Sequence, residues 1–167
     1  MTSIFVDINV SFFPSQIGDS RANEHHTLTV IHTLWMREHN RLAQLLKNQH
    51  PSWNDEKLYE ESRRIVIAEY QHIIYKEWLP HILGLPYMKE SGLYPSQDGY
   101  VVNYQDGDDF DPRITNEFAV AAFRFGHSLI PSSFKKITRN RQSRAQDLKT
   151  LFFNPRSITE EEGTMLG

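Results

Sequence analysis

Three segments of the chain carry apolar residues at the three- and four-residue spacing of an amphipathic helix: 23–49, 54–80 and 112–130. The first is predicted to begin at Asn23, because asparagine is a good helix N-cap. The second is predicted to begin at Asn54 or Asp55 and to end near Pro80, because a residue before proline avoids the helical conformation. Pro112 suits the first turn of the third. The predicted fold class is mainly α, with three long helices.

Few apolar residues remain outside these segments to cover them. Residues 84–111 are rich in Gly, Pro, Asp and Tyr and are predicted to form a long surface loop, with one short strand at 100–104. Beyond Pro131 a basic stretch precedes a turn-rich anchor, and no regular element is predicted there. Three amphipathic helices need apolar partners. We therefore expect the chain to form part of a larger α-helical core.

Composition excludes several classes of function. The net charge of −3 gives no electrostatic basis for nucleic-acid binding. No apolar run reaches the 18 or more residues of a membrane-spanning helix, and the N-terminus lacks the features of a signal peptide. The chain contains no cysteine, which excludes disulfides and thiolate chemistry and favours a reducing compartment.

Arg124 and His127 stand out within the apolar stretch FAVAAFRFGHSLI, which is predicted to be a buried helix. Residues three apart share a helical face. Gly126 removes side-chain bulk beside the histidine. An imidazole with a free nitrogen can bind iron, and a nearby arginine can pair with a cofactor carboxylate. The alternative is a core histidine beside an ion-paired arginine.

The stretch GDSRANEHH places Arg21 and Glu24 around the start of the first helix. A glutamate near a helix N-terminus is favourable because of the helix dipole, and Arg21 could simply pair with it. The functional alternative is an arginine held at a cavity wall with a carboxylate beside it.

Three histidines, His25, His32 and His39, recur at seven-residue steps on almost one face of the first helix. Consecutive members would lie about 10 Å apart along the axis, too far for one metal ion. We therefore expect no metal site in this stripe, and predict interhelical hydrogen bonds for His32 and for His39, the latter together with Glu38.

Four blocks occur in order along the chain: GDSRANE, HTLWMREHNRLAQLL, WNDEKLYEESRRIVIAEYQHIIYKEWLPHILG and DPRITNEFAVAAFRFGHSLI. Together they resemble the animal-type haem peroxidases, most closely the invertebrate chorion-peroxidase and peroxidasin-like branch. The tail LKTLFFNPRSITEEEGTMLG resembles the segment after the proximal helix in that family. The resemblance covers residues 18–167, which would be part of the family's all-helical domain, and leaves residues 1–17 poorly matched.

The resemblance implies a role for each candidate residue. His127 matches the proximal histidine that binds haem iron, and Arg124 matches the arginine that pairs with a haem propionate. Arg21 matches the distal arginine that assists cleavage of peroxide. Glu24 matches the carboxylate that can form an ester with a haem methyl group. His25 replaces a methionine that bonds to haem in one mammalian member, so a sulfonium link is excluded here.

The implied activity is oxidation of halide or phenolic donors by hydrogen peroxide, with haem b as cofactor. The resemblance also implies an extracellular location, although this chain shows no signal peptide. The charge and hydropathy of the sequence predict no nucleic-acid or membrane partner, and the sequence indicates no oligomeric state.

Several family features have no counterpart in this sequence. The family's distal histidine, first ester-forming aspartate and calcium ligands lie upstream of GDSRANE, and the asparagine that bonds the proximal imidazole lies downstream of Gly167. We therefore expect an incomplete catalytic domain, about a third of the family's. The alternative is a non-catalytic haem-binding or interaction module, and a third interpretation is a helical module without a cofactor.

Overall fold

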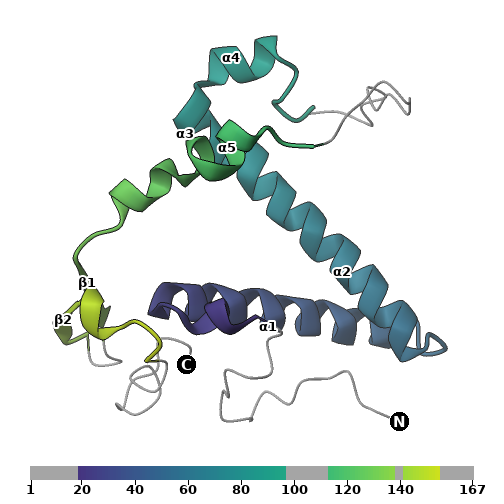
Figure 1. Ribbon diagram of the computed structural model, residues 1–167. Helices are drawn as coiled ribbons and strands as arrows, with labels where there is room; N and C mark the ends of the chain where they lie inside the picture. The colour runs from purple at the N-terminus through teal and green to yellow at the C-terminus, as the bar shows by residue number, and fades with distance from the viewer. Residues whose placement is uncertain (1–18, 97–112, 138–140, 155–167) are drawn as a thin grey trace. The chain divides into compact units, whose positions relative to one another are not determined.

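A computed structural model describes most of the chain: residues 19–96, 113–137 and 141–154 (Figure 1). The chain divides into two compact units. The first comprises residues up to Tyr70 and from Ser132 onwards, and the second comprises Gln71–Pro131. The predicted strand at 100–104 and the poorly matched segment 1–17 lie outside the described residues.

The first long helix, α1, spans His26–Gln49 and follows a 3-10 turn at Ser20–Asn23. Its N-cap is His25, whose backbone is extended and whose Nδ1 accepts a hydrogen bond from the Thr27 N–H at 3.1 Å. The prediction that Asn23 caps this helix is therefore wrong. The imidazole supplies the acceptor that an asparagine side chain usually provides.

The second long helix, α2, spans Asp55–His72 and begins where predicted. The Asn54 side chain accepts a first-turn N–H at 2.9 Å. In the connecting turn, Lys47 Nζ donates to the carbonyl oxygens of Pro51 and Trp53 at 2.9 and 3.0 Å. A lysine in the last turn of α1 thus binds carbonyl groups that the helices leave without partners.

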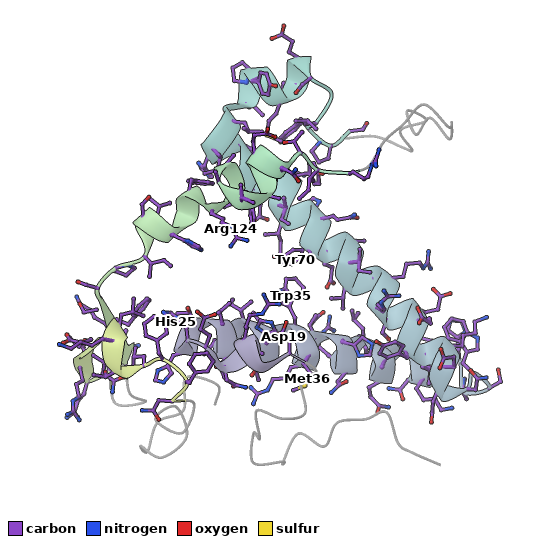
Figure 2. All side chains as sticks on the ribbon, in the orientation of Figure 1. Asp19, His25, Trp35, Met36, Tyr70 and Arg124 are labelled. Carbon is purple, nitrogen blue, oxygen red and sulfur yellow. The ribbon has the colours of Figure 1, made fainter. Side chains whose placement is uncertain are left out.

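Two aromatic contacts join α1 to α2 within the first unit. His39 Nε2 lies 3.3 Å from the Tyr59 carbonyl oxygen, and the two rings are 5.0 Å apart. Trp35 meets Tyr70 edge-on, with ring centroids 5.2 Å apart (Figure 2). The predicted interhelical contact is confirmed for His39 but not for Glu38, whose carboxylate accepts hydrogen bonds from Arg41 on the same helix at 2.8 and 2.6 Å. The predicted interhelical contact of His32 is wrong, because its Nδ1 bonds a carbonyl oxygen four residues earlier in α1, at 2.6 Å.

The second unit continues the helix through a wider turn and then forms two short helices: the π-turn Ile73–Trp78, α3 (Leu79–Leu83) and α4 (Leu85–Glu90). The predicted end at Pro80 is therefore too early. Proline crowds the carbonyl four residues back in an α-helix, and the π-turn immediately before it shifts the hydrogen bonds to five residues. Gly84, with φ of +82°, separates α3 from α4.

The third predicted helix is interrupted. It consists of α5 (Asn116–Val120) and a 3-10 helix at Ala122–Leu129, separated by Ala121 with φ −134° and ψ −65°. The prediction of a buried helix is also wrong for this structure, in which Val120 is 71% and Leu129 70% exposed. Helices are stabilised mainly by packing of an apolar face. In the described residues, this segment lacks that packing.

A β-hairpin follows in the first unit, where no regular element is predicted. Strand β1 (Ser133–Ile137) pairs antiparallel with β2 (Ser143–Asp147). Figure 1 shows the hairpin at the N-terminal end of α1. The Leu148 N–H then donates to the Ser132 carbonyl at 2.8 Å, and a 3-10 turn leads to the buried Leu151.

Among the described residues, few apolar side chains are buried. Leu58, Met88 and Leu151 are essentially inaccessible, whereas Leu34 on α1 is 53% exposed and Phe118 on α5 is 48% exposed. Apolar helix faces of this kind are usually covered by another surface. This agrees with the expectation from the sequence that few apolar residues remain outside the helical segments to cover them. Within the described ranges, no helix is long and apolar enough to cross a membrane.

Candidate haem-peroxidase site

Arg21 lies on the 3-10 turn before α1, bound to Asp19. The Asp19 carboxylate accepts hydrogen bonds from the Arg21 main-chain N–H at 2.9 Å, from Nε at 3.1 Å and from Nη2 at 2.7 Å. Hydrogen bonds from Arg21 lower the pKa of Asp19 to about 2, and the carboxylate raises the pKa of Arg21. The interpretation that Arg21 pairs with Glu24 is therefore wrong, because Asp19 occupies the guanidinium.

Glu24 is half-buried directly after this turn. Its main-chain oxygen accepts a hydrogen bond from the Phe153 N–H at 3.0 Å. Within the part of the chain that the structure describes, its carboxylate has no hydrogen-bond or ion-pair partner. Glu24 therefore offers a free carboxylate on a backbone held by a distant segment.

His25 is buried, with 8% of its surface exposed, and its ring lies edge-on to Phe134 and Phe152 at 4.8 and 6.2 Å. Because Nδ1 accepts the Thr27 N–H, the proton of a neutral ring must lie on Nε2. That Nε2 is buried without a partner among the described residues. Burial, and secondarily the charge of His26, lower the pKa of His25, while Glu24 opposes the shift.

His26 is 5% exposed, and its Nε2 lies 2.8 Å from the Asn154 carbonyl oxygen. Since a carbonyl only accepts, the imidazole donates this bond. Sequence reasoning did not identify His26. The partner lies 128 residues further along the chain, so no local spacing could have indicated it.

Arg124 and His127 both lie on the 3-10 helix Ala122–Leu129 of the second unit. Residues three apart in a 3-10 helix lie directly above one another, so the expected shared face is present. Both side chains are exposed. Figure 2 shows Arg124, whose Nε donates to the Ala119 carbonyl at 3.1 Å and whose guanidinium lies 5.0 Å from the Phe123 ring centroid.

The alternative of a core histidine beside an ion-paired arginine finds no support in this geometry, because His127 is exposed. No carboxylate within the described ranges forms an ion pair with Arg124. Gly126 faces open space, because an added Cβ would meet no atom within 4 Å. Arg21 belongs to the first unit and His127 to the second.

The family model for animal haem peroxidase matches residues 9–166, which include both the Arg21 turn and the His127 helix. The chain belongs to the animal haem peroxidase family.

Relatives of this haem peroxidase chain include insect and human proteins. It is 43% identical to a chorion peroxidase of Aedes aegypti over 143 residues, and 44% identical to a peroxidasin homolog of Homo sapiens over 166 residues. These matches cover 86% and 97% of this chain, but 18% and 11% of the relatives. Peroxidase A from Dictyostelium discoideum is a similar solved structure, with TM-score 0.67 and 35% identity over 89% of this chain and 27% of that one.

Membership of the haem peroxidases implies a haem, and the side chains of the second unit fit one. His127 offers an exposed imidazole, and Gly126 leaves the space beside it open. Arg124 offers a guanidinium whose terminal nitrogens have no carboxylate partner among the described residues. The described residues contain no cluster of three or more metal-ligating side chains, and a haem iron needs only one axial ligand from the chain.

Proposed function

We propose that this protein is a peroxidase that uses hydrogen peroxide and haem b to oxidise a small halide or phenolic donor. The observation that carries the proposal is the family match, because it spans the Arg21 turn and the His127 helix together. The chain covers less than a fifth of the curated relatives described above, so the activity of the whole protein is part of the proposal.

His127 is the proposed axial ligand. A neutral imidazole binds iron through one ring nitrogen, and the exposed side chain of His127 makes that nitrogen accessible. Gly126 places no side chain next to the histidine, and an added Cβ there would meet no atom within 4 Å, so a haem would meet no obstruction from this position. When bound, the haem supplies an iron centre that exchanges electrons with peroxide and with the donor.

Arg124 is the proposed partner of a haem propionate. Its Nε is fixed by the Ala119 carbonyl at 3.1 Å, which leaves the terminal nitrogens for a carboxylate. An arginine fork binds a carboxylate through two parallel hydrogen bonds. Arg124 would thereby orient the haem relative to His127.

Arg21 is the proposed electrostatic group on the peroxide side. Asp19 holds the guanidinium through Nε and Nη2, which fixes its orientation and leaves Nη1 unbonded within the described residues. The fixed cation would stabilise negative charge that develops on a peroxide oxygen. Glu24, with its free carboxylate, is the proposed site of an ester to the haem.

We propose an extracellular location, as the family resemblance implies. The proposal specifies the donor only by its class, a halide or a phenol.

Peroxide-dependent oxidation of guaiacol by the haem-loaded, full-length protein tests this function. We expect turnover well above that of free haem. Arg21→Gln should lower kcat/KM for peroxide by roughly 10²–10³-fold, the size reported for one electrostatic donor. Arg41→Gln is the matched control, because Arg41 is bound to Glu38 in the same two-pronged way at 2.8 and 2.6 Å.

Two results would change the assignment. Turnover no greater than that of free haem would favour the non-catalytic haem-binding module. Full activity in Arg21→Gln would show that Arg21 has no electrostatic role in the reaction with peroxide.

A further inference from the structure

Three consecutive residues after the Arg21 turn are all held by residues far along the chain. The Glu24 carbonyl accepts the Phe153 N–H at 3.0 Å, and the His25 ring contacts Phe134 and Phe152. His26 Nε2 donates to the Asn154 carbonyl at 2.8 Å. We call the four distant residues, Phe134 and 152–154, the clamp.

The clamp is itself anchored. Phe134 lies on β1, whose pairing with β2 fixes its position, and Leu151 before the other three residues is only 2% exposed. His25 and His26 are also buried, at 8% and 5% exposed. Hydrogen bonds screened from water are electrostatically stronger than exposed ones. The clamp therefore holds the start of α1 both through the main chain of Glu24 and through the side chains of His25 and His26.

The backbone of Phe153 indicates that these contacts determine the local conformation. Its φ of +50° lies in the left-handed region, which a bulky residue with a Cβ rarely adopts. Its N–H bonds Glu24, and the carbonyl of the next residue, Asn154, bonds His26. Such a conformation persists where surrounding structure over-determines it.

The Arg21 turn is otherwise held by α1: Thr29 Oγ1 donates to the Ala22 carbonyl oxygen at 3.3 Å and to Asn23 Oδ1 at 3.4 Å, and Ala22 and Asn23 are buried. Arg21 and Asp19 are both exposed, and their mutual bonds span only two residues. The turn ends at Asn23, one residue before the clamped stretch 24–26. The placement of the Arg21 guanidinium and of the Glu24 carboxylate therefore depends on the residues that follow them.

We propose that His26, through its bond to Asn154, is a positioning residue that fixes the Arg21–Glu24 segment for reaction with peroxide. The inference rests on the proposed peroxidase function. His26 does not touch the reacting atoms. It sets where Arg21 and Glu24 lie, and a small displacement of a positioned group can cost large factors in rate.

Hydrogen exchange in the full-length protein tests the clamp without reference to activity. His26→Ala should raise exchange about tenfold in residues 20–26 and 151–154, the size expected from losing one hydrogen bond. Exchange in the hairpin strands should stay unchanged. His26→Gln keeps a side-chain donor and should restore protection. His32→Ala is the matched control. Like His26, His32 lies on α1 and bonds a main-chain carbonyl oxygen, but its partner is Leu28 on the same helix and not a residue of the clamp.

Peroxide kinetics of the haem-loaded protein test the positioning role. His26→Ala should lower kcat/KM for peroxide at least about tenfold with little change in KM for the donor, and His26→Gln should recover most of it. If His26→Ala does not fold, Phe152→Leu provides a second variant, since it keeps apolar volume but removes the ring beside His25. We expect Phe152→Leu to cause the same faster exchange and the same loss of kcat/KM for peroxide, but to a smaller extent.

The outcomes separate the two proposals. Unchanged exchange in residues 20–26 would overturn the clamp. Faster exchange with unaltered peroxide kinetics would overturn the positioning role and leave the peroxidase function standing. A wild-type protein without peroxide turnover would overturn the peroxidase function and the positioning role together, while the exchange data would still establish or reject the clamp.

Discussion

The main-chain N–H of Thr27 donates to Nδ1 of His25 at 3.1 Å, and Thr27 Oγ1 lies 2.6 Å from the same nitrogen. A histidine thus caps the long helix α1, and it can do so only while Nδ1 is unprotonated. The same ring is buried against Phe134 and Phe152. Helix capping and hairpin packing therefore both depend on a neutral imidazole.

We expect this dependence to appear as an acid sensitivity of folding. Burial lowers the pKa of His25 below its ordinary 6.5. Between the two values the unfolded chain binds more protons, so the free energy of unfolding should fall as pH drops below about 6.5. Chemical denaturation between pH 8 and pH 5 measures the effect.

His25→Asn is the control for that experiment. Asparagine is a good N-cap and does not titrate, so the variant should keep the cap and show a shallower pH dependence. Loss of the aromatic packing should lower its stability at every pH. A pH dependence as steep as that of the unsubstituted protein would show that His25 is not the group responsible.

The Asp19–Arg21 pair predicts a second titration effect. The pKa of Asp19 is lowered from 3.8 to about 2, first by the hydrogen bond from the Arg21 side chain. The stabilisation from this pair is therefore present above about pH 4 and is lost as pH falls towards 2. In Arg21→Gln, carboxyl resonances followed by NMR should show the pKa of Asp19 returning towards 3.8.

The Arg41–Glu38 pair provides the comparison. Arg41→Gln should raise the pKa of Glu38, whose value is lowered mainly by its hydrogen bond to Arg41, and should leave Asp19 unchanged. An Asp19 pKa that stays near 2 without the Arg21 guanidinium would mean that another group holds the carboxylate.

Among substitutions on α1 and α2, we expect replacement of Leu58 to lower the free energy of unfolding most. Its side chain is 2% exposed on α2. Leu58→Ala should cost about 2–5 kcal/mol through lost burial and the cavity left behind. Glu60→Ala, which removes an exposed pair to Arg63 at 3.2 Å, should cost no more than about 1 kcal/mol in the same denaturation experiment. Equal losses would indicate that Leu58 does not contribute to a core.

Phe153 tests the backbone strain in the clamp. A residue with a Cβ pays roughly 1–2 kcal/mol in the left-handed region, and glycine is disfavoured elsewhere by about 0.5–1 kcal/mol of chain entropy. Phe153→Gly should therefore be more stable than Phe153→Ala by up to about 1 kcal/mol. Both keep the N–H that bonds Glu24. A less stable glycine variant would contradict the conformation seen at φ +50°.

The sequence predicted those parts of the fold that depend on local pattern. The end of α1 and the start of α2 follow from helical periodicity and from Asn54 as a cap. The cap of α1 was missed because histidine is not among the usual capping residues. The continuation past Pro80 was missed because a π-turn precedes the proline, and periodicity does not predict a single wide turn.

The remaining differences arise from long-range contacts. The hairpin strands SFKKI and SRAQD are polar, and the one aromatic residue among them packs on His25, more than a hundred positions away. The interrupted third helix shows the converse, because its apolar periodicity is present but the surface that would cover it is not among the described residues. The candidate residues stood out in the sequence itself, but their roles came from the family resemblance and stay predictions.

The most direct measurement of the central proposal is the haem spectrum of His127→Gly with and without free imidazole. We expect the substitution in the haem-loaded, full-length protein to shift the Soret band and abolish peroxide turnover, and added imidazole to restore both by occupying the vacated position. His81→Gly, which removes another exposed histidine of the second unit, should change neither. An unaltered Soret band in His127→Gly would contradict the assignment of His127 as the haem ligand.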